Sequence, residues 1–236
     1  MKVKIDYFRL MKNQFLLFLC LIFSASCLGQ QKYFFDYLIE YDFQLLETHK
    51  TQKILFLTNS KDNSYFIQVS EKDSLTYNVY FLDSKGIIST TYINKNDFQT
   101  AEMITLKCDF VSHFINPFKY QVENYHFENK NDTLVGEDKL GYYILKSNNA
   151  KRAKKKKLGI NHYIVEKNTD FHLPLLLNFE TAFEEYKTDN KIPNGIPKIL
   201  YTTSFLGKKS LIYHLKSFSK INNMLFVPKE CIYTNP

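Results

Sequence analysis

The chain is poor in the residues and motifs on which many enzymes depend. Its 236 residues include no tryptophan, seven glycines, six prolines and four cysteines. The sequence contains no Gly-rich phosphate loop, no CxxC or His/Cys pair at zinc spacing, and no GxSxG nucleophile motif. These absences remove the sequence support for a nucleotide, zinc or serine-nucleophile site. We therefore expect no cofactor, no metal and no catalytic residue, with a hydrolase only as a third choice.

A long apolar run occurs only near the N-terminus. Residues Phe15–Phe23 form an unbroken run of nine apolar residues, which basic residues precede and the small residues 24–26 follow. A membrane-spanning helix needs about 20 apolar residues, whereas this arrangement is typical of a secretory signal peptide. We expect residues 1–29 to be a signal peptide and residues 30–236 to form a single β-rich domain.

Two routes of processing fit this N-terminus. Cys27 and Gly29 place small residues at the positions that precede ordinary cleavage before Gln30. The stretch from Ser24 to Cys27 loosely resembles a lipobox, which would leave an acylated Cys27. The expected location is therefore periplasmic or secreted, with an outer-membrane lipoprotein anchored at Cys27 as the second choice.

Positive charge is concentrated in one stretch. Without the four basic residues and one acidic residue of 1–29, the totals of 31 and 24 become 27 basic and 23 acidic residues. The stretch KRAKKKK supplies six of the 27, so the remainder has 21 basic residues against 23 acidic ones. Proteins that grip nucleic acid usually spread their cations over a face, and we expect no nucleic-acid partner. The six cations are Lys151, Arg152, Lys154, Lys155, Lys156 and Lys157.

The place of this stretch in the chain suggests two interpretations. It follows a strand-like pattern at Gly141–Lys146 and precedes another at Ile160–Glu166. Such runs are usually solvated loop tips, because like charges repel one another. The functional alternative is contact with an anionic membrane surface, at about 1 kcal/mol per basic residue.

Alternation with a period of two dominates the rest of the chain. In Phe35–Gln44 the odd positions are apolar or aromatic, and four of the five even positions are polar, which is the pattern of a half-buried strand. Shorter copies recur between polar turn clusters. The pattern predicts a mainly β (α+β) fold with a single antiparallel, curved meander sheet or half-barrel.

One segment has helical periodicity instead. In Pro174–Lys187 the apolar residues fall on one stripe and the glutamates on the other side, which predicts an amphipathic helix packed on the sheet. The stripe residues that would cover a ligand are Leu175, Leu176, Phe179, Phe183 and Tyr186.

The remaining cysteines and histidines leave alternatives open. Cys108 and Cys231 are the only pair left after export, and they are either a disulfide or two buried thiols. Their long loop would make a disulfide worth about 4–5 kcal/mol. His162 and His172 are near enough in sequence to Glu166 and Asp170 for a weak acid–base site, the basis of the hydrolase alternative, although polar residues that hold a loop in place explain them better.

Aromatic residues are numerous, with 17 Tyr and 21 Phe. They either fill a plain core or line an apolar groove on the concave face of the sheet. The signal peptide, the meander and the packed helix resemble uncharacterised exported β-rich proteins of the Gram-negative envelope and, loosely, the LolA/LolB-like half-barrels. This resemblance is one of architecture and implies lipid or lipoprotein carriage on a concave apolar face.

Together these patterns predict an exported, non-catalytic envelope protein, a monomer, that binds or carries an acyl-chain ligand between sheet and helix. The expected partners are a lipid or an envelope protein, and an anionic membrane surface. The alternative is a structural or protein-interaction module of the envelope with a filled interior and no ligand pocket.

Overall fold

The computed structural model describes residues 31–117, 119–177, 180–189 and 191–232. The strands are β1 Gln31–Leu45, β2 Lys50–Asn59, β3 Asp62–Glu71, β4 Thr76–Asp83, β5 Ile87–Asn94, β6 Met103–Thr105, β7 Val111–His113, β8 Tyr125–Val135, β9 Asp138–Ser147, β10 Ile160–Val165, β11 Pro197–Thr203 and β12 Lys209–Val227. The helices are α2 Lys95–Thr100, α3 Ala150–Lys156 and α4 Glu180–Asp189, with short 3-10 turns η1 Cys108–Phe110, η2 Lys119–Asn124 and η3 Lys229–Ile232.

The twelve strands belong to one open sheet. Their order is β7-β5-β4-β3-β2-β1-β12-β11-β10-β9-β8, and β6 pairs with β12 beside this path. All of these pairings are antiparallel except the short one between β6 and β12. The predicted mainly β class and curved antiparallel sheet are therefore confirmed.

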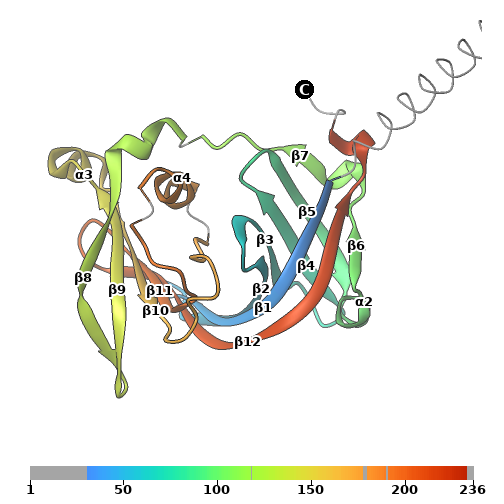
Figure 1. Ribbon diagram of the computed structural model, residues 1–236, viewed down its shortest axis with the longest axis horizontal. Coiled ribbons are helices and arrows are strands. Elements are labelled where there is room, and N and C mark those ends of the chain that lie inside the picture. The colour runs from blue at the N-terminus through green and yellow to red at the C-terminus, as the bar shows by residue number, and fades with distance from the viewer. Residues whose placement is uncertain (1–30, 118, 178–179, 190, 233–236) are drawn as a thin grey trace, which may run out of the picture.

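The first and last strands form the centre of this sheet. β1 and β12, of 15 and 19 residues, pair from Gln31 opposite Val227 to Leu45 opposite Leu211. The register shifts twice along the pair, and at both places β12 carries one residue more than β1. Such bulges bend a strand, and Figure 1 shows the two strands curving around the space that contains α4.

The period-two pattern of β1 is confirmed by burial. Phe35, Tyr37, Ile39 and Tyr41 are each at most 7% exposed. Tyr37, Ile39 and Tyr41 pack on the concave face together with the segment around α4. We call this cluster the concave-face core. Phe35 joins a different cluster, which we call the second core.

The two cores lie on opposite faces of the β2–β5 part of the sheet. In β2, Ile54 and Phe56 join the concave-face core, whereas Leu55 and Leu57 join the second core. Neighbouring residues of a strand point to opposite faces. This part of the sheet is thus buried on both sides, which explains the continuous apolar run Ile54–Leu57 in β2.

The helix lies where the sequence placed it but begins later. We expected it over Pro174–Lys187, and α4 begins at Glu180. The backbone before it is held by the β2–β3 turn, because Leu173 N donates to Ser60 O at 2.9 Å and Asn63 Nδ2 donates to Pro174 O at 2.9 Å. Leu175 and Leu176 therefore lie in an irregular arm, and Phe179 falls outside the described residues.

The basic stretch is a helix and not the open loop that we expected. It does connect β9 to β10, as the strand patterns predicted. Asn149 Oδ1 accepts a hydrogen bond from Arg152 N at 3.0 Å and caps the helix. The helix ends at Lys157, whose φ of 51° is left-handed.

Cys108 and Cys231 form a disulfide in the structure, with sulfur atoms 2.13 Å apart and a sequence separation of 123 positions. The bond joins η1 to η3. It therefore fastens the end of β12 to the chain that follows β6, beside the second core, which includes Cys231.

We predict that replacing both cysteines by alanine will lower the free energy of unfolding by about 5 kcal/mol, because the unfolded chain would regain the freedom of a long loop. Urea unfolding of the wild type with and without reductant provides the control, since reduction should reproduce most of the loss. Two reactive thiols in the unfolded, unreduced chain of residues 30–236, which contains no other cysteine, would contradict the bond.

Candidate ligand-binding site

The concave face of the sheet is covered by one excursion of the chain. Residues 167–196 leave β10 and return to β11, and we call them the cover. Its base is closed by Glu166 N, which donates to Ile196 O at 2.9 Å. Gly195 has a φ of 140°, and a Cβ there would lie 2.4 Å from a methyl of Val165, so only glycine fits this return.

The cover fills the space in which the sequence placed a ligand. Leu175, Leu176, Leu177 and Phe183 are between 0% and 8% exposed and belong to the concave-face core. Tyr186 packs against the same core while partly exposed. The described stripe residues thus face the sheet as predicted, and any ligand on this face would have to replace them.

A buried histidine fastens the arm of the cover to the sheet. His172 is fully buried, and its Nε2 lies 2.8 Å from Thr58 Oγ1 on β2. Its Nδ1 lies 2.5 Å from Leu173 O, so Nδ1 carries the proton and Nε2 accepts from the Thr58 hydroxyl. Burial lowers the pKa of His172, and the neutral ring suits both contacts.

The helical half of the cover is held by polar contacts. We expected the glutamates of α4 on its wet side, but Glu184 and Glu185 are only 8% and 5% exposed. Glu184 Oε1 lies 3.5 Å from Asn116 Nδ2, and its Oε2 lies 3.3 Å from Lys187 Nζ. This face of α4 therefore rests on polar groups, while Ala182 and Phe183 of the same helix are buried in the concave-face core.

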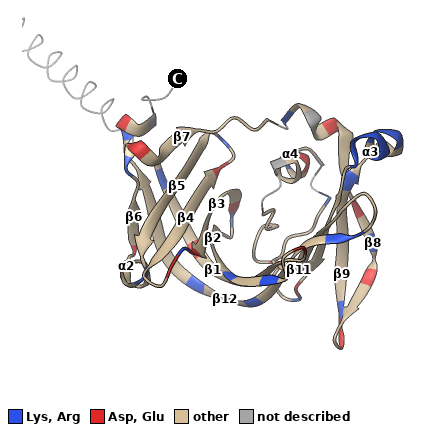
Figure 2. Cartoon of the chain, turned by 180° about the vertical axis from the view of Figure 1, so that it is seen from behind, with Lys and Arg blue, Asp and Glu red and all other residues tan. Residues whose placement is uncertain are grey.

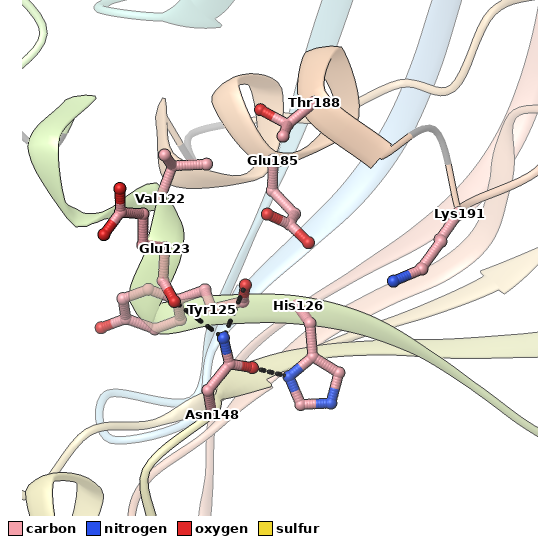
Figure 3. Close-up of a pocket in the computed structure, with 8 residues that line it drawn as sticks. All are labelled: Val122, Glu123, Tyr125, His126, Asn148, Glu185, Thr188 and Lys191. Atoms are coloured by element: carbon pink, nitrogen blue, oxygen red, sulfur yellow. Dashed lines mark hydrogen bonds between the residues drawn. The ribbon is translucent and has the colours of Figure 1, made fainter.

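A pocket opens beside this half of the cover. It has a volume of about 440 Å³ and lies between α4 and the start of β8. Figure 3 shows Glu185 on one side of it and His126 and Asn148 on the other. Asn148 Nδ2 donates to Glu123 O at 2.9 Å, which ties β9 to the turn before β8. Tyr125 also lines the pocket and packs against the concave-face core.

The basic helix lies next to this pocket. Figure 2 shows α3 as a concentration of positive charge at one corner of the molecule. The guanidinium of Arg152 is 5.3 Å from the ring centre of Tyr125, close enough for a cation–π contact. Arg152 is half-buried, whereas Lys151 and the lysines of 154–157 are exposed.

The predicted acid–base cluster is not assembled. His162 Nδ1 lies 2.6 Å from Tyr142 Oη and Nε2 lies 3.0 Å from Thr203 Oγ1, with the ring stacked on Tyr201 at 4.2 Å between centres. His172 has the separate partners given above. Within residues 31–117, 119–177, 180–189 and 191–232, no group of three or more His, Cys, Asp or Glu is placed to hold a metal.

The comparisons with known proteins give no family. No protein-family model and no curated protein matches the chain. One similar solved structure is a chain of the Pseudomonas aeruginosa MucA/MucB complex, at 7% identity and a TM-score of 0.38, where 80% of this chain covers 52% of that one. Another is a putative outer membrane lipoprotein-sorting protein domain from Vibrio parahaemolyticus, at 9% identity and a TM-score of 0.29, with 81% and 85% covered.

These values are too low to assign a function. The names of these structures are therefore not carried over to this chain. This chain spans about half the length of the MucA/MucB chain that it matches. None of the helices in the described ranges is long and apolar enough to cross a membrane.

Several residues of this region were not found from the sequence. Asn116 and Asn148 are isolated polar residues in stretches without a pattern, so nothing marked them. Glu184 and Glu185 were assigned to the solvent side because charged residues are rarely buried. Only the packing of α4 against the chain before η2 shows their position.

His162 should make the fold sensitive to acid. Its burial and the nearby charge of Lys209 lower its pKa to about 4, against about 6.5 in an unfolded chain. Below about pH 6.5, His162 binds a proton in the unfolded state but stays neutral in the folded state. The free energy of unfolding therefore falls as the pH drops from about 6.5 to about 4.

We predict that His162→Gln will flatten this part of the pH dependence, measured as the free energy of unfolding in urea. His172→Gln is the comparison. The pKa of His172 is also lowered, so this variant should remove a separate contribution to the pH dependence of the free energy of unfolding. An unchanged slope in His162→Gln would contradict the assignment.

Proposed function

We propose that this protein is an exported, non-catalytic protein of the cell envelope that binds an acyl-chain ligand on the concave face, in exchange for the cover. The observation that carries the proposal is the pocket between α4 and β8. It borders the concave-face core at Tyr125, lies against the helical half of the cover, and adjoins the basic helix.

Exchange of the cover for a ligand replaces one buried apolar surface by another, so its cost and its gain come from the same effect. Burying a Leu or Phe side chain contributes about 1.5–3 kcal/mol, and a ligand gains about 25 cal/mol per Å² of apolar surface by the same effect. An acyl chain that replaces Phe183 and its apolar neighbours recovers what their exposure costs. The sheet below them offers aromatic side chains, including Tyr41, Phe56 and Tyr213.

The basic helix supplies a second part of the proposal. Its five cations and Lys157 would guide the protein to an anionic membrane and face an anionic headgroup near the pocket, mainly affecting encounter rate and salt dependence. The alternative is a protein-interaction module of the envelope without a ligand, and the filled concave face is the observation that favours it.

We predict that locking the arm of the cover will remove ligand from the concave face. Asn63→Cys with Pro174→Cys puts a thiol on each of two residues that now meet, since Asn63 Nδ2 donates to Pro174 O at 2.9 Å. The oxidised double variant should lose one bound lipid in native mass spectrometry of protein purified from an envelope fraction. The two single variants are the controls, and equal lipid content in all forms would favour the interaction module.

We predict that replacing the five cations of α3 and Lys157 by glutamine will weaken binding to phosphatidylglycerol vesicles by about tenfold or more, at about 1 kcal/mol per cation near the surface. The wild type should lose the same binding as salt is raised. Phosphatidylcholine vesicles are the control. If the variant and the wild type bind anionic vesicles equally, α3 is a solvated connection only.

A further inference from the structure

A second pocket lies on the other face of the sheet, away from the cover. It is enclosed by β4 and β5 on one side and by residues 101–110, which we call the strap, on the other. Its volume is about 490 Å³, within the range of about 300–1,000 Å³ that small-molecule sites occupy.

The pocket has an apolar floor and apolar residues at its rim. Val79 and Leu106, which line it, are 1% and 2% exposed and belong to the second core. At the rim, Met103 and Phe110 are 59% and 40% exposed. Two large apolar side chains left in water at one opening indicate a binding surface rather than scattered exposure.

The strap is fixed along its length, so the pocket exists before any ligand arrives. Asn223 Nδ2 donates to Ala101 O at 2.7 Å, and Leu106 N donates to Phe226 O at 3.0 Å. Between these points β6 pairs with β12. The disulfide of Cys108 closes the far end. A preformed site binds without the cost of ordering its walls.

A cation stands at the opening. Lys107 lines the pocket, is exposed, and takes part in none of the ion pairs found between described residues. One carboxylate, Asp97, also lines the pocket and accepts from Asn94 Nδ2 at 3.2 Å. Lys107 is thus the group at the opening that can meet an anion.

We propose that this pocket binds a single acyl chain that ends in an anionic head. The chain lies against Val79 and Leu106, and the head faces Lys107. The site is built by the second core and the strap. It stands whether or not the concave face binds a ligand.

The test uses palmitate, with hexadecanol as a probe of the same chain without the charge. Binding is measured in the oxidised Asn63→Cys/Pro174→Cys protein, in which the cover is locked. We expect palmitate to bind there with one molecule per chain and hexadecanol to bind about 2–5-fold more weakly, the effect of one exposed charge pair. Equal affinity for the two probes would overturn the proposed recognition of the head.

Two matched pairs of variants locate the site. Thr91→Trp fills the pocket and should weaken palmitate binding by about tenfold or more, as loss of buried chain surface requires, whereas Thr90→Trp, on the opposite face of β5, should not. Lys107→Gln should weaken palmitate by about 2–5-fold and leave hexadecanol unchanged, with Lys208→Gln as its control.

The two sites can be told apart by these outcomes. Palmitate binding that survives Thr91→Trp but disappears when the cover is locked belongs to the concave face and overturns this inference. Binding lost in Thr91→Trp and kept in the locked protein supports it, even if the concave face proves to bind nothing. Circular dichroism and urea unfolding of Thr91→Trp confirm that its loss of binding is not a loss of folding.

Discussion

Pairing between β1 and β12 is the constraint on which the rest of the structure depends. These strands come from opposite ends of the described chain, and their ladder joins the meander β1–β5 to the meander β8–β12. Without it there would be two smaller sheets, each with an unpaired edge. The two bulges on β12 bend the shared strands, so the curvature that creates a concave face is a property of this single pairing.

The bend determines what the concave face can do. A curved sheet cannot be covered by a second flat layer, and the chain covers it with one irregular excursion whose helix is short. The arm of this cover is fixed by His172 and by backbone bonds to the β2–β3 turn. Its helical half rests on Glu184 and Asn116. Apolar side chains of both halves, Leu175 and Phe183 among them, are buried on the sheet. We place ligand entry at the pocket beside β8 because it opens next to the helical half.

The face of β2–β5 opposite the cover is closed in a different way. Among the described residues, no layer of helices lies over this face, and its apolar residues are covered by the strap, η3 and the first half of β1. Six residues of α2 and three of β6 are too few to seal this surface. An opening remains, ringed by apolar side chains, and the disulfide keeps the strap in position over it.

Local patterns of the sequence were enough to predict the mainly β class and the buried face of β1. They also predicted the position of the stripe that packs on the sheet and the place of KRAKKKK between two strands, because alternation and turn chemistry are local. The pairing of β1 with β12 follows from the tertiary structure alone, since no local pattern indicates which of two strands far apart in the chain will pair.

The candidate sites divide in the same way. Leu175 and Phe183 were found because apolar periodicity marks a buried stripe, whereas the burial of Glu185 and the opening between Tyr92 and Lys107 depend on contacts between distant segments. The arm before α4 has a helical pattern, but bonds to the turn at Ser60 and Asn63 prevent the helix from starting there. Long-range packing, which no local pattern encodes, chose between the alternatives that the sequence left open.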